Sequence, residues 1–286
     1  MSASADSLFG FVQFEFGFLL GPADGRFLIR RAPGEDPDNV LVLTTLGAPE
    51  RRRFKDRKGR QLQEAEPEPV PTNRATVVRA DPFETREEAS AWLTGVRQSR
   101  ERAGEELASS AQVLARALHA HRVAHADPHT RDVASHQAIA TRIGYGHGTA
   151  VAEGRYEEAW EMPREPRRTR RSMEAPDERF AALLGAREQV LVCEELVLRV
   201  RADLSAGRAR EAALSARVAL ESVLAELRGD LAHSRRATLE SDRAVVADAA
   251  NAALRGSLDS ELTGALAEAA EHMESALRAR RLHSSI

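Results

Sequence analysis

The chain has 286 residues and is 42% hydrophobic, which is enough for about two modest domains, each with its own core. Its formal net charge of −3 gives no global field that would draw it onto nucleic acid or an anionic membrane. The single cysteine, Cys193, excludes an intramolecular disulfide, and its apolar neighbours predict a buried, inert thiol.

No part of the sequence predicts a membrane span or a signal peptide. No apolar run approaches about 18 residues, and no basic region precedes an apolar core with a cleavage site. We therefore expect a soluble, cytoplasmic protein without a membrane partner. Lysine occurs only at Lys55 and Lys58 among 41 basic residues, a composition typical of a high-GC genome and similar to that of actinobacterial proteins. An arginine cluster is therefore weak evidence for a phosphate site.

Residues 9–46 and 75–79 show strand patterns. Apolar residues alternate with Gln13 and Glu15 at period two, which predicts one apolar face. That face comprises Val12, Phe14, Phe16 and Phe18. The turn at residues 21–25 predicts a hairpin whose return strand is residues 27–29. The continuous apolar run at residues 40–43 predicts a central strand, and residues 75–79 a fourth strand.

Two helices are predicted to follow, over residues 85–121 and 128–143. The first begins with a capping box, in which Thr85 accepts a hydrogen bond from the backbone N–H of Glu88. Its apolar stripe from Trp92 to Leu118 predicts that it covers the sheet. The second begins at Asp127-Pro128 and ends at Gly144.

Residues 162–177 lack periodicity and contain three prolines, which predicts a flexible linker. Residues 178–286 show four apolar seams at near-heptad spacing, separated by glycines. The seams are Val190, Cys193, Val197, Val200 and Leu204; Ala213, Ala216, Leu220, Val223 and Leu227; Leu239 to Leu254; and Leu262, Leu266, Ala269, Met273 and Leu277. The predicted fold is therefore α+β: a small antiparallel sheet packed by a long helix in residues 1–161, then the linker, then an antiparallel helical bundle. Because these seams contain few large side chains, we expect a partner or a second copy of the chain.

Six of the nine histidines lie between His119 and His147. His121 and His125 are one helical turn apart, so both imidazoles can face one metal ion, with His129 as a third ligand. The alternative is a group of exposed histidines at a helix junction. The sequence predicts no cofactor.

The segment Arg131-Asp132-Val133-Ala134-Ser135-His136 has an arginine, a polar residue and a histidine at the spacing Arg-polar-x3-His. This pattern resembles that of HEPN-type ribonucleases over six residues. The resemblance implies that Arg131 and His136 lie on one helix and act on a scissile phosphate at a dimer interface. The alternative places His136 in the core, because it falls on the apolar stripe of the predicted helix.

Two basic segments are candidates for nucleic-acid binding. They consist of Arg51, Arg52, Arg53, Lys55, Arg57 and Lys58, and of Arg167, Arg168, Arg170 and Arg171. The alternative for the first is a solvated loop, neutralised by the acidic residues 64–68. The glycines of residues 144–148 are a further candidate, for phosphate, although a turn at a helix end explains them better. Gly207 resembles the turn glycine of tetratricopeptide helix hairpins.

No Ser/His/Asp order and no Gly-x-Ser-x-Gly elbow occurs. The leading hypothesis is a cytoplasmic, non-enzymatic interaction or scaffold protein that self-associates through its helical bundle. The first alternative is a ribonuclease or nucleic-acid-binding protein that uses Arg131 and His136, although the net charge does not support it. The second is a metal-binding protein that uses the His119–His136 cluster.

Overall fold

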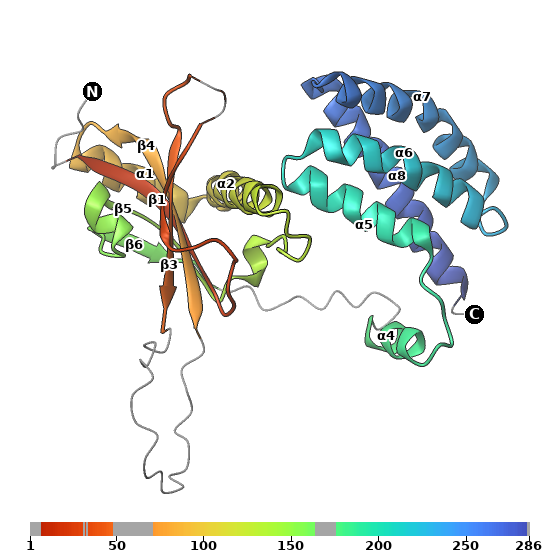
Figure 1. The fold of residues 1–286 in the computed structure, drawn as a ribbon, viewed down its shortest axis with the longest axis horizontal. Coiled ribbons are helices and arrows are strands. Elements are labelled where there is room, and N and C mark those ends of the chain that lie inside the picture. Colours follow the sequence, from red (N-terminus) through yellow and green to blue (C-terminus); the bar gives the residue numbers. More distant parts are fainter. Residues whose placement is uncertain (1–6, 31, 33, 48–70, 164–175, 285–286) are drawn as a thin grey trace, which may run out of the picture. The chain divides into compact units, whose positions relative to one another are not determined.

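The computed structural model describes residues 7–30, 32, 34–47, 71–163 and 176–284. The chain divides into two compact units, residues 1–165 and 166–286. The first unit contains all the strands that are described and the second contains helices, so the predicted α+β class is confirmed (Figure 1). Within the described residues, no helix combines the length and the apolar character that a bilayer crossing requires.

The first unit is built on a six-stranded antiparallel sheet with the order β2-β3-β4-β1-β5-β6. Its strands are β1 (Leu8–Phe16), β2 (Gly25–Ile29), β3 (Asn39–Leu46), β4 (Thr72–Phe83), β5 (Ala140–His147) and β6 (Glu158–Glu161). The strands predicted at residues 40–43 and 75–79 are confirmed as parts of β3 and β4, and β3 is an interior strand.

The predicted hairpin between the first two strands is wrong. β1 pairs with β4 on one side and with β5 on the other, so neither of its edges is free for β2. β2 pairs with β3 instead, and Asp38 N–H donates to the carbonyl of Ile29 in the connection between them. The apolar face of β1 is confirmed at Val12, Phe14 and Phe16, whereas Phe18 lies beyond the strand and is 40% exposed.

Residues 85–121 form two helices rather than one: α1 (Arg86–Gln98) and α2 (Arg100–Ala124). The break is Ser99, whose backbone is extended and whose side chain accepts a hydrogen bond from the N–H of Arg102. A serine hydroxyl favours such a cap because it satisfies an N–H that has no partner in the first helical turn. The predicted cap at Thr85 is confirmed, at 3.1 Å from the Glu88 nitrogen. Both helices pack on the sheet face that holds Val12 and Phe14.

The helix predicted over residues 128–143 is absent. This segment contains only the short 3-10 helix η1 (Ser135–Gln137) before it enters β5. The N–H of Ile139 donates to the carbonyl of Glu15 at 2.6 Å, which draws the segment onto β1. Ile143 and Tyr145 are then buried at the two-residue period of a strand.

Gly144 and Gly146 therefore lie within a strand, not in a turn that binds phosphate. Residues of α3 (Gly148–Ala152), of β6 and of the segment between them lie close to these two glycines. A Cβ atom on Gly144 would lie 2.4 Å from the carbonyl oxygen of Glu158, and one on Gly146 would lie 3.0 Å from the Cα of Tyr156. The two glycines allow this close backbone approach.

The second unit consists of α4 (Pro176–Leu184), α5 (Val192–Ser205), α6 (Ala209–Glu226), α7 (His233–Arg255) and α8 (Ser260–Ser284). Helices α5 to α8 pack side by side around one core (Figure 1). The predicted seam residues form this core, except that Leu204 and Leu262 are only half-buried and Val190 and Leu254 are exposed. Gly207 and Gly256 adopt positive φ at the ends of α5 and α7, where residues with a Cβ are disfavoured.

Candidate functional site

The clustered histidines lie at the end of α2 and in the segment after it. The rings of His121 and His125 are 4.0 Å apart between centroids, and His125 Nδ1 lies 3.0 Å from the carbonyl oxygen of His121. His129 lies beyond the helix end. Within the ranges that the structure describes, no group of three or more His, Cys, Asp or Glu side chains is placed to hold a metal ion. The first two histidines are therefore brought together, but without a third ligand.

Arg131 and His136 do not share a helix, because the helix that the resemblance requires is absent. His136 belongs to η1 and is exposed, so it is not a core histidine either. Arg131 lines a cavity that His136 does not line. The ribonuclease function stays a prediction, and this arrangement adds no support to it.

The cavity that Arg131 lines has a volume of about 370 Å³ and lies between two segments of the first unit. One wall is the loop after β1, and the other is the segment that runs from the end of α2 through η1. Its lining residues are Phe18, Leu19, Leu20, Gly21, Asp127, His129, Thr130, Arg131, Asp132, Val133 and Gln137. Cavities that bind small molecules have volumes from about 300 to 1,000 Å³, so this one is large enough for a small ligand.

A chain of hydrogen bonds fixes the first wall. The N–H of Leu20 donates to Asn73 Oδ1 at 2.6 Å, and Asn73 Nδ2 donates to Thr45 Oγ1 at 2.8 Å. Thr45 in turn donates to the carboxylate of Asp24 from both its backbone N–H and its hydroxyl. Asn73 is 6% exposed, so the anchor of the loop is buried. Sequence reasoning missed Asn73, because its role depends on a contact across 53 residues.

The second wall begins with a turn around Asp127. Its carboxylate accepts hydrogen bonds from the hydroxyl of Thr130 at 2.7 Å and from the N–H of His129 at 2.9 Å. These two bonds hold the pKa of Asp127 below its ordinary value, the Thr130 bond more than the His129 bond. The two walls meet at Gly21, where a Cβ atom would lie 3.8 Å from Cγ2 of Thr130.

In the second unit, exposed apolar side chains gather in α4 and the first half of α5. Five large ones in residues 180–198 are between 60% and 72% exposed: Phe180, Leu184, Val190, Val192 and Leu198. Elsewhere in the described residues, only Leu19, Val123 and Leu254 reach 60% exposure. We call residues 180–198 the apolar segment. These side chains are close in the sequence and lie on two helices and the loop between them.

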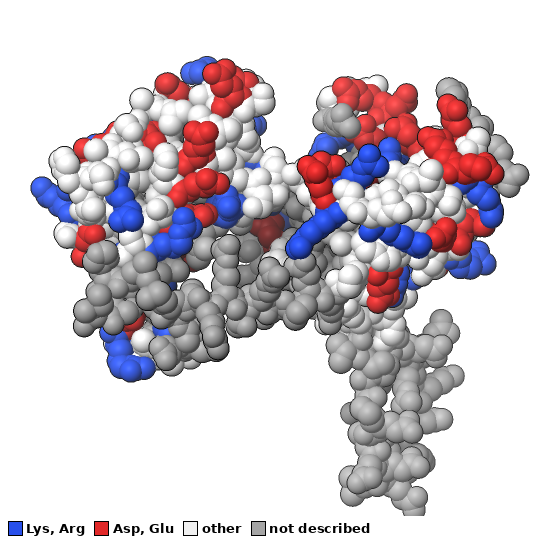
Figure 2. Space-filling view, turned by 180° about the vertical axis from the view of Figure 1, so that it is seen from behind, with Lys and Arg blue, Asp and Glu red and all other residues white. Residues whose placement is uncertain are grey.

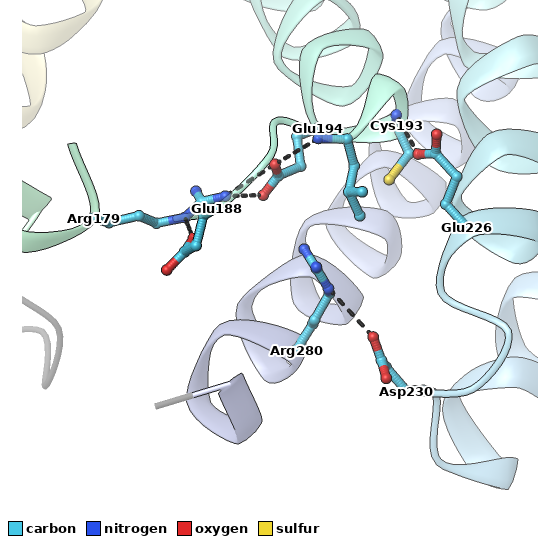
Figure 3. A network of polar contacts seen from close by, with 8 residues as sticks. Arg179, Glu188, Cys193, Glu194, Glu226, Asp230 and Arg280 are labelled. Carbon is cyan, nitrogen blue, oxygen red and sulfur yellow. Dashed lines mark hydrogen bonds and ion pairs between the residues drawn. The ribbon is translucent and has the colours of Figure 1, made fainter. Parts of the chain in front are cut away.

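One arginine holds α4 against the start of α5 (Figure 3). Arg179 donates to both carboxylate oxygens of Glu194, at 2.7 and 2.9 Å, and to Glu188 at 3.3 Å. The Glu194 side chain is only 5% exposed, so its charge depends on such donors. The backbone N–H of Leu191 also donates to Glu194, which caps α5. This arrangement places Phe180 and Val192 on elements that are tied to each other.

Cys193 lies beside this network, and its backbone N–H donates to Glu226 at 2.8 Å (Figure 3). The residue is fully buried, and burial, with a smaller effect of the Glu226 carboxylate, raises the pKa of Cys193 to about 12. The thiolate is the reactive form of cysteine, so the folded protein keeps this thiol inert.

We therefore expect Cys193 not to react with the thiol reagent DTNB at pH 8 in the native protein, and to react fully and rapidly in denaturant. The absorbance of the released thionitrobenzoate measures both reactions. Stoichiometric labelling of the native protein within minutes would contradict the buried position.

The two basic segments predicted to bind nucleic acid, Arg51 to Lys58 and Arg167 to Arg171, lie outside the described residues. On the face drawn in Figure 2, acidic and basic side chains are interspersed over the second unit rather than gathered by sign. Comparison of the chain with protein-family models, with curated proteins and with solved structures finds no match.

Proposed function

We propose that this protein is a non-enzymatic interaction protein that self-associates through the apolar segment, residues 180–198. The observation that supports the proposal is the exposure of its five large apolar side chains, of which Leu184 at 72% is the most exposed. Burial of a fully exposed side chain of this size contributes about 1.5–3 kcal/mol, and these side chains, which are 60% to 72% exposed, would each contribute roughly two thirds of that. Ten such side chains from two copies are enough to offset an association cost of about 4–15 kcal/mol.

A second copy of the chain is the partner that the charges favour. Residues 166–286 contain 19 arginines and 19 aspartates and glutamates, so their formal charge is zero. Two copies of this unit therefore meet without net repulsion. The same surface on both copies gives a closed dimer, the commonest symmetric assembly.

The variant Leu184→Glu tests this proposal, with Leu254→Glu as its matched control. Both leucines are highly exposed, at 72% and 68%, and both lie in the last turn of a helix of the same unit. Because a charge at residue 184 would be buried in the dimer, we expect the first variant to weaken association by at least about 10-fold. The second variant is expected to associate like the wild type.

Sedimentation velocity over a range of concentrations measures the association constant of all three proteins. Equal weakening by both variants, or by neither, would contradict a role for the apolar segment. Circular dichroism shows whether each variant retains the helical content of the wild type.

A further inference from the structure

The cavity in the first unit is independent of the proposed function, because it lies far along the chain from the apolar segment. We propose that it binds a small molecule that combines an acidic group, a carboxylate or a phosphate, with an apolar body. Arg131 holds the acidic group, and Phe18, Leu19 and Val133 contact the apolar part.

The hydrogen-bond donors left open at the cavity, rather than its net charge, favour an anion over a cation. Both oxygens of Asp127 already accept hydrogen bonds, from His129 and Thr130. The carboxylate of Asp132 lies 3.9 Å from the guanidinium of Arg122 and has a further partner besides. Arg131, in contrast, makes no ion pair or hydrogen bond with any other residue that the structure describes. A guanidinium with free donors binds carboxylate or phosphate through two parallel hydrogen bonds.

The apolar lining defines the rest of the ligand. Phe18 is 40% exposed and Leu19 is 62% exposed, although both closely follow β1, in which Phe14 and Phe16 are buried. Val133 contributes from the opposite wall. A ligand body that covers these side chains removes apolar surface from water, which an inorganic anion alone does not do. The acidic group and the apolar body therefore bind together more tightly than either does alone.

Hydrogen bonds hold both walls of the cavity in place. Leu20 is tied to the buried Asn73, and the Asp127 turn is closed by two hydrogen bonds. The N–H of Ile139 anchors the far end of the second wall to β1. Walls that are already fixed lose little conformational freedom when a ligand binds, so a small molecule can gain useful affinity.

The experiment uses pairs of probes that share an apolar body. Binding of 4-phenylbutyrate and of 4-phenylbutylamine to the full chain is measured by isothermal titration calorimetry, and 4-phenylbutyl phosphate replaces the carboxylate in a third titration. Arg131→Gln is compared with Arg116→Gln, a change at an exposed arginine of α2 that does not line the cavity.

We expect at least one of the two anions to bind the wild type, and the amine to bind at least 10-fold more weakly than that anion. Arg131→Gln is expected to lower the affinity for the anion at least 5-fold, and Arg116→Gln to leave it unchanged. Which anion binds more tightly identifies the acidic group. Equal binding of the amine, an unchanged affinity of Arg131→Gln, or no binding of either anion to the wild type would overturn the proposal. None of these results depends on whether the chain self-associates.

Discussion

Replacing Gly144 with alanine is expected to destabilise the first unit by about 3 kcal/mol or more. The added Cβ would lie 2.4 Å from the carbonyl oxygen of Glu158 and 2.8 Å from the Cα of Ala159. Both atoms belong to the backbone of β6, so neither can move aside without disturbing the pairing of β5 with β6. The change therefore separates two strands rather than crowding one flexible side chain.

Tryptophan fluorescence during urea unfolding measures this effect specifically. The only two tryptophans, Trp92 and Trp160, both belong to the first unit, and Trp160 pairs with Ile143 next to the substituted glycine. Gly104→Ala is the control, because Gly104 lies in α2 with nothing within 4 Å of an added Cβ. Alanine there is expected to stabilise the unit by about 0.5–1 kcal/mol. If Gly144→Ala unfolded at the wild-type urea concentration, residues 140–147 would not form the strand described.

Replacing Asp203 with alanine is expected to destabilise the second unit by about 3–5 kcal/mol. Asp203 and Arg208 close the turn between α5 and α6, and Arg208 Nε donates to Asp203 Oδ1 at 2.7 Å. Their side chains are only 8% and 7% exposed. Removal of the carboxylate leaves the buried guanidinium without this partner, which costs more than the ion pair itself contributes.

The rate at which the Cys193 thiol reacts with DTNB in increasing urea reports unfolding of the second unit, since the first unit contains no cysteine. Glu221→Ala is the control, because its ion pair with Arg243 is exposed, at 56% and 49% of the side chains. The control is expected to change stability far less. The double variant Asp203→Leu/Arg208→Leu is expected to recover part of the loss, since it leaves no buried charge in this turn. Equal midpoints for Asp203→Ala and Glu221→Ala would show that the buried pair does not stabilise the turn.

The helical unit was predictable because its signals are local. The seams around Cys193 and Leu220 repeat at the period of a helix, and a glycine at positive φ ends α5 and another ends α7. Each of these features is visible within one or two turns of chain. The alternation of Val12, Phe14 and Phe16 is equally local, and it located β1 and its buried face.

The predictions for the first unit are wrong where contacts between distant residues override the local sequence pattern. Asp127-Pro128 is a typical start of a helix, but the Asp127 carboxylate closes a turn on His129 and Thr130 instead. Beyond that turn, pairing with β1 draws residues 140–147 into the sheet, and their glycines permit close packing of β6. No pattern within the segment distinguishes such glycines from those of a turn.

The candidate cavity was predictable only in part. Arg131 and His129 stood out as residues with binding chemistry, and both line it. The opposite wall, Phe18 to Gly21, resembled the end of a strand and a turn. Its position depends on the bond from Leu20 to Asn73, between residues that are 53 positions apart. The exposure of the apolar segment could not be predicted for a different reason. In a helical sequence, Val190 and Leu198 have the pattern of core residues.

The measurement that tests the central claim most directly is the molar mass of the wild-type chain in solution by multi-angle light scattering, from about 1 to 100 μM. The chain has a mass of 31.3 kDa. If two copies bury the apolar segment of each other, the weight-average mass rises with concentration towards twice that value. A mass that stays at 31.3 kDa over the whole range would contradict self-association.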